Sequence, residues 1–65
     1  MTDVPSMFAE LTSAIEDLHG IAVEGLAPNL SSDIQLCLLA SISTGLTSLC
    51  AMSKKTSKAI SELQS

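Results

Sequence analysis

The sequence contains few aromatic residues and little charge. Its 65 residues include one phenylalanine, no tryptophan and no tyrosine, and charged residues make up 15% of the chain. Three lysines stand against seven acidic residues, which gives a formal net charge of −4. A nucleic-acid-binding surface needs clustered lysine and arginine to neutralise phosphates. Because this chain cannot supply such a cluster, we expect no nucleic-acid partner.

Cysteine and histidine are also scarce, which limits both cross-linking and catalysis. If Cys37 and Cys50 share one helix, they are about 20 Å apart, too far for a disulfide. We expect two reduced thiols in the core, as is usual for a cytoplasmic protein. His19 is the single imidazole, and it lacks the partners that a zinc site or a catalytic triad requires. We therefore expect no enzymatic activity, no metal and no cofactor.

Apolar aliphatic residues, by contrast, are abundant. Hydrophobic residues make up 46% of the chain, and the mean hydropathy is +0.44. A domain this small buries only about 60% of the surface of its unfolded chain. Part of the apolar surface should therefore be covered by another molecule.

The first half of the chain has the periodicity of one helix. Pro28 lies in the only dense group of helix breakers, at residues 28–32, and Pro5 suits a first helical turn. Gly20 and Gly25 are expected to mark the close approach of another backbone. Apolar residues recur at alternating spacings of four and three, which is typical of a helix seam. This predicted stripe comprises Val4, Phe8, Leu11, Ile15, Leu18, Ala22 and Gly25, widened on one side by Met7, Ala14 and Ile21.

The second half predicts a longer helix. Ser32 and Gln35 have the spacing of a capping box, in which each side chain bonds to the other residue's backbone N–H. The same alternating spacing then continues to the end of the chain. The predicted stripe of this helix comprises Leu39, Ile42, Leu46, Leu49, Ser53, Thr56, Ile60 and Leu63.

These patterns predict an all-α fold, an antiparallel hairpin of two long helices. Residues 1–65 form a single domain, with one helix over about 5–27, a turn at 28–32 and a second helix over about 33–63. We expect self-association, or a helix from a partner protein, to complete the hairpin as a bundle.

Residues 34–53 contain no charge, although the outer face of a two-helix hairpin normally carries lysine and glutamate. This stretch is therefore expected to be covered by other copies of the chain, by a different protein or by a membrane. The predicted interface comprises Leu39, Ser41, Ile42, Thr44, Gly45, Leu46, Ser48 and Leu49.

A membrane span at residues 34–52 is the alternative. The mean hydropathy of this segment is about +1.6, near the threshold for transmembrane helices. Its length of about 29 Å matches the hydrocarbon core. Gln35, several central hydroxyls and the lack of interfacial aromatic residues favour the soluble interpretation instead.

The turn and the second helix resemble those of the needle subunits of type III secretion systems. The similarity lies in residues 26–33 (LAPNLSSD) and in a longer second helix that passes through residues 57–60 (SKAI). Needle subunits are small helical hairpins, and similar short helical co-chaperones hold them in the cytosol. The resemblance implies a cytoplasmic assembly subunit or co-chaperone, and an adaptor is equally consistent with the pattern.

Overall fold

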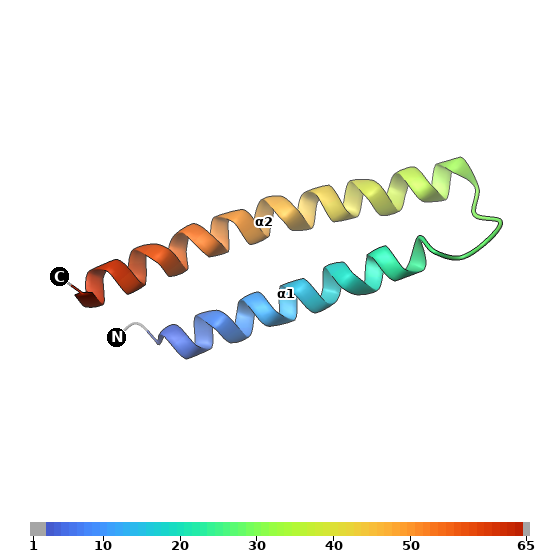
Figure 1. Cartoon of the computed structure of the whole chain (residues 1–65). Helices are drawn as coiled ribbons and strands as arrows, with labels where there is room; N and C mark the ends of the chain where they lie inside the picture. Colours follow the sequence, from blue (N-terminus) through green and yellow to red (C-terminus); the bar gives the residue numbers. More distant parts are fainter. Residues whose placement is uncertain (1–2, 65) are drawn as a thin grey trace.

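The computed structural model describes residues 3–64, which form two helices and no strand. Helix α1 spans Val4–Glu24 and helix α2 spans Ser32–Gln64. The helices lie side by side and antiparallel, so that the start of α1 lies near the end of α2 (Figure 1). The molecule measures 53 × 16 × 13 Å. The predicted all-α helical hairpin is therefore confirmed.

Helix α1 begins at a side-chain cap and ends earlier than predicted. The Asp3 carboxylate accepts hydrogen bonds from the Ser6 N–H at 3.3 Å and the Ser6 hydroxyl at 2.6 Å. At the other end, the N–H groups of Leu26 and Ala27 donate to carbonyls three residues back, at 3.0 and 3.3 Å. Such tight turns end an α-helix, and Pro28 disfavours helical backbone at the residue before it. The predicted end near residue 27 is thus wrong by three residues.

Helix α2 is capped by Ser31 rather than by Ser32. The Ser31 hydroxyl accepts from the Ile34 N–H at 3.3 Å, and the Ser31 carbonyl accepts from the Gln35 N–H at 3.0 Å. The predicted capping box at Ser32 is therefore wrong by one residue, because two adjacent serines are equally good caps. Asn29 has a φ of 68°, a left-handed conformation that asparagine tolerates and that helps to reverse the chain.

One row of residues on each helix is turned toward the other helix. Thr56 and Ala59 are the most enclosed, at 5% and 7% exposure. A Cβ placed on Gly45 would overlap Leu18 Cδ2 and stand 3.1 Å from Leu18 Cγ, so the helices approach closely there. We call this row the covered stripe. It comprises Val4, Met7, Leu11, Ala14, Leu18 and Ile21 of α1, and Leu38, Ile42, Gly45, Leu49, Met52, Thr56 and Ala59 of α2.

The covered stripe shares every second residue with the predicted stripes. At the positions between, it contains the residue that directly precedes the predicted one. Phe8 and Ile15 were expected in the seam but are more than half exposed, as are Leu39 and Leu46. The physical reason is that a two-helix seam needs only two apolar positions in each heptad. This sequence has apolar residues at three positions of the heptad, so two different pairs of positions could form the seam. The expected close approach at Gly20 is also wrong, because nothing lies within 4 Å of a Cβ built there.

Candidate interaction surface

A second apolar row runs beside the covered stripe on each helix, and no other described part of the chain encloses it. On α1 this row repeats every seven residues, one position after the covered residues Met7, Ala14 and Ile21. In an antiparallel pair, equivalent flanking positions of the two helices lie on the same side of the seam. We call this side the open stripe. It comprises Phe8, Ile15 and Ala22 of α1, and Leu39, Leu46, Ser53 and Ile60 of α2.

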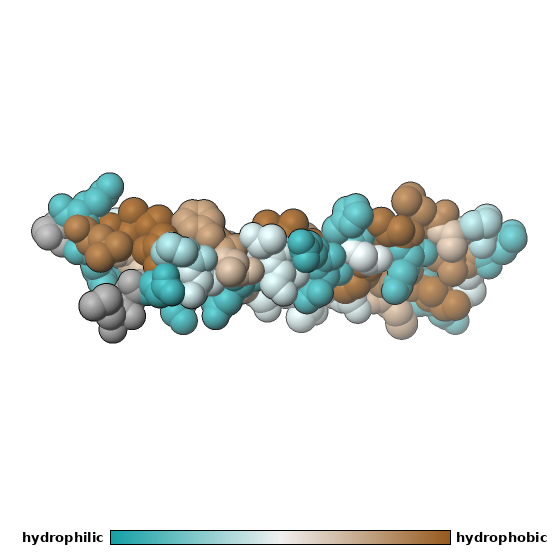
Figure 2. Space-filling view, turned by 90° about the horizontal axis from the view of Figure 1, so that it is seen from below, coloured by the Kyte–Doolittle hydropathy of each residue, from teal (hydrophilic) through white to brown (hydrophobic). Residues whose placement is uncertain are grey.

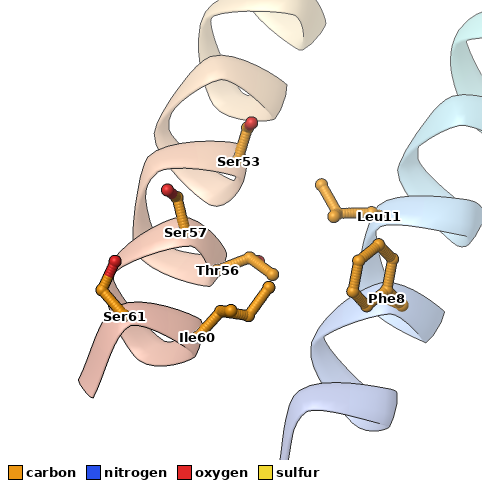
Figure 3. A pocket seen from close by; sticks show the side chains of 7 residues that line it. All are labelled: Phe8, Leu11, Ser53, Thr56, Ser57, Ile60 and Ser61. Carbon is orange, nitrogen blue, oxygen red and sulfur yellow. The ribbon is translucent and has the colours of Figure 1, made fainter. Parts of the chain in front are cut away.

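The open stripe borders a long apolar groove. Its larger part has a volume of about 530 Å³ and lies between Ile15 of α1 and Leu46 of α2. A second part of about 280 Å³ continues toward the ends of the chain, where Thr56 and Ile60 reach toward Phe8 (Figure 3). The two parts share Phe8, Leu11 and Ser53 and therefore form one groove. The remaining lining residues are Thr12, Leu49, Cys50, Ser57 and Ser61.

None of the residues that line this apolar groove carries a charge. Four acidic residues, the N-cap of α1 and three residues within α1, instead form a row with seven-residue spacing on the other flank of the covered stripe. Lys55, Lys58 and Glu62 border a separate hollow on that same flank, beside Met7. Lys55 and Lys58 thus lie next to the N-terminal half of α1. The acidic row comprises Asp3, Glu10, Asp17 and Glu24, all of them exposed.

Hydroxyl groups add little polarity to the groove. The Thr12 hydroxyl donates to the Phe8 carbonyl at 2.9 Å, and the Thr56 hydroxyl donates to the Met52 carbonyl at 2.8 Å. These bonds stay within one helix, as expected for hydroxyls on a helix that another element covers. The groove therefore presents mainly methyl, methylene and aromatic surface.

The predicted interface residues fall into three sets. Leu39 and Leu46 belong to the open stripe. Ser41, Thr44 and Ser48 are exposed on other faces of α2, away from the groove. The remaining residues, Ile42, Gly45 and Leu49, lie in the covered stripe against α1.

Sequence reasoning missed the contribution of α1 to this surface. It assigned Phe8 and Ile15 to the intramolecular seam, and it did not consider Cys50 as a groove residue. The available signal was the third apolar position in each heptad of α1, at Phe8, Ile15 and Ala22, which is typical of helices in bundles.

The described residues offer little reactive chemistry. Residues 3–64 contain no group of three histidine, cysteine or acidic side chains that could hold a metal ion. Cys37 and Cys50 are free thiols and both are exposed, so their expected place in the core is wrong. Neither cysteine belongs to the covered stripe, because the spacing of both residues places them on other faces of α2.

The hairpin exposes an unusually large surface for its mass. Its accessible area is 4975 Å², whereas a compact monomer of this mass exposes about 3,900 Å². Hydrophobic residues stand uncovered on the surface between hydrophilic ones, as Figure 2 shows for one face. The chain by itself thus leaves about 1,000 Å² more surface in water than a compact domain does.

Helix α2 also has the length and composition of a membrane span. Within the described residues it is the one helix that meets both criteria, with a mean hydropathy of 1.6 over an 18-residue window. None of that window is buried inside the hairpin.

No protein-family model matches the sequence, and neither a characterised protein nor a solved structure shows significant similarity to it. The observations that bear on function are accordingly the apolar groove, the distribution of charge and the exposed area.

Proposed function

We propose that this chain is a small non-enzymatic protein–protein interaction module, which acts as an assembly subunit, adaptor or co-chaperone. The observation that carries the proposal is the uncharged apolar groove along one side of a hairpin whose charges lie elsewhere. Soluble monomers rarely leave contiguous apolar patches of several hundred Å² exposed, and larger patches mark sites of association. The resemblance of the turn to that of needle subunits favours an assembly role in the cytoplasm.

The amount of exposed surface supports the same proposal. A standard protein–protein interface removes about 800 Å² from each partner. The excess exposure of about 1,000 Å² relative to a compact monomer is of this size. One interface of ordinary dimensions would therefore give this chain the burial of a compact domain.

The alternative function is a single-span membrane protein with the span at residues 34–52, which the hydropathy of α2 favours. The hairpin geometry opposes it. Leu11 and Ser53 line one groove, and a Cβ on Gly25 would lie 3.9 Å from Leu38 Cδ1. The segment of α1 from 11 to 25, with Glu16, Asp17 and Glu24, is thus level with the span. Each carboxylate at hydrocarbon depth would cost about 2.5–3.5 kcal/mol, so the hairpin would have to open.

Light scattering of the untagged chain in buffer without detergent tests this proposal. We expect a soluble, helical protein whose mass is well above the chain mass of 6.7 kDa. A fully helical species of 6.7 kDa at micromolar concentration would contradict the proposal. Extraction from the membrane fraction only with detergent would contradict it in favour of the membrane span.

A further inference from the structure

We propose that the apolar groove is occupied by a second copy of this chain. The two hairpins stack face to face through their open stripes, with α1 antiparallel to α1 and α2 antiparallel to α2, and form a four-helix bundle. The inference rests on the proposed function and adds the identity of the partner, the contact face and the symmetry.

The spacing of apolar residues matches a bundle better than an isolated pair of helices. A two-helix seam requires two apolar positions in seven, whereas the core-facing helices of a bundle use a third position on one side. Both helices carry that third position, on the same side of the seam. A second layer of two helices is what such a face accommodates.

The sizes of the open-stripe residues are complementary under a two-fold axis. An axis at the level of Ile15 places this residue beside its own equivalent, since Ile15 lies midway between Phe8 and Ala22. Phe8 then meets Ala22 of the second copy, so the largest side chain of the row lies against the smallest. A large side chain opposite a small one is the arrangement that fills an interhelical core.

The corresponding residues of α2 pair about an axis at the same level. The midpoint of the α2 row lies between Leu46 and Ser53, and both residues line the same groove as Ile15. The axis therefore pairs Leu46 with Ser53 of the second copy and Leu39 with Ile60. Leu46 opposite Ser53 again combines a large side chain with a small one, whereas Leu39 opposite Ile60 forms an aliphatic pair at each end of the row.

The charge distribution selects a second copy over a membrane surface. In the stacked dimer, the acidic row from Asp3 to Glu24 points away from the interface, so the net charge of −4 on each chain does not oppose association. Amphipathic helices that lie on membranes carry lysine and arginine beside their apolar face. Here α1 carries no lysine or arginine.

The mass of two matched variants tests the contact face. Ile15 and Val23 are both β-branched residues of α1, and they are 55% and 46% exposed in the single hairpin, but Val23 lies outside the groove. In buffer without detergent we expect twice the chain mass for the wild type and for Val23→Glu, and the mass of one chain for Ile15→Glu. We expect Ile15→Glu to weaken the dimer at least a hundredfold, because it buries a carboxylate near its own equivalent.

The outcomes separate this inference from the proposed function. An assembly that survives Ile15→Glu but dissociates with Thr44→Lys would overturn the groove as the contact while leaving the interaction module intact. A wild-type monomer, or a chain that requires detergent, would overturn both. Equal dissociation by Val23→Glu would also overturn the assigned face.

The native cysteines test the antiparallel arrangement. The two-fold axis passes close to Cys50, which lines the groove, so the two Cys50 thiols of a dimer lie near each other. Cys37 is about three and a half helical turns, or about 20 Å, from that level, so the two Cys37 thiols are about 40 Å apart. A short bismaleimide should therefore cross-link Cys37→Ser chains but not Cys50→Ser chains. If the two hairpins were stacked in parallel instead, the Cys50 thiols would lie at opposite corners of the four-helix bundle. Loss of cross-linking in Cys37→Ser would therefore overturn the antiparallel dimer.

Discussion

The covered and open stripes of α2 lie one residue apart and both contain large apolar residues, but only the first packs against α1. The covered stripe includes the small residues Gly45 and Ala59 beside large ones such as Leu49. The open stripe of α2 contains Leu39, Leu46 and Ile60, and it has no glycine or alanine. Helices approach most closely where side chains are small. Small residues, rather than the largest apolar ones, thus select the row on which this hairpin closes.

The largest expected contrast is between Leu49 and Leu46, one from each stripe. Leu49→Ala should cost about 2–3 kcal/mol, the lower range for a leucine in a core, because Leu49 is half-buried. Leu46 is 56% exposed in the hairpin, so Leu46→Ala should cost less than about 1 kcal/mol in a monomer. Thermal unfolding of both variants in the Ile15→Glu background measures this difference.

The same pair reports on the second copy. In the wild-type background, the cost of Leu46→Ala should rise with protein concentration, because association buries this residue. The cost of Leu49→Ala should rise less steeply with concentration, because Leu49 already packs against α1 in the monomer and only borders the groove. If both variants destabilised the monomer equally, the assignment of the two stripes would be wrong.

A second test enlarges a small residue of the covered stripe. Gly45→Leu should destabilise the hairpin by about 1–3 kcal/mol, because its side chain would occupy the space of Leu18. Chemical denaturation with a helix-sensitive probe would measure the loss. The matched control is the double variant with Leu18→Ala, which should recover part of the stability through direct coupling of the two sites. Independent, additive effects would show that Leu18 does not pack against Gly45.

The fold was predictable from sequence, but the face by which each helix packs against the other was not. Pro28 and the helical periodicity on either side of it predict two antiparallel helices, and the structure confirms them. The helix ends differ from the predicted ones because local backbone geometry decides where i to i+3 turns form and which of two adjacent serines caps a helix. The packed face differs from the predicted one because three neighbouring apolar positions permit two alternative seams. Only packing at Gly45 and Ala59 distinguishes the two seams.

The candidate site was predictable only in part for the same reason. The absence of charge in residues 34–53 correctly marks α2 as a helix with uncovered apolar surface. It does not reveal that α1 contributes Phe8 and Ile15 to the same side, because this depends on which row pairs with α2. Whether Ser41, Thr44 and Ser48 contact a partner stays a prediction.

A third test concerns the N-terminal cap of α2. Ser31→Ala should cost about 1 kcal/mol, since it removes the acceptor of the Ile34 N–H. Ser32→Ala, one residue later, should stay within about 0.5 kcal/mol. Melting temperatures of the two variants at equal concentration provide the comparison. The reverse order would restore the capping box at Ser32 and Gln35.

The smallest expected effect is at Gly20, which lies on an exposed face of α1, whereas Gly45 lies in the covered stripe. Gly20→Ala should stabilise the hairpin by about 0.5–1 kcal/mol, because alanine favours the helix and a Cβ there meets nothing within 4 Å. For a chain of this length, the melting temperature should rise by a few degrees. Gly45→Ala is the control, since its gain in helix propensity is offset by the displacement of Leu18. Equal stabilisation by both alanines would mean that the covered stripe has room at Gly45, and that side-chain size there does not decide which row α1 covers.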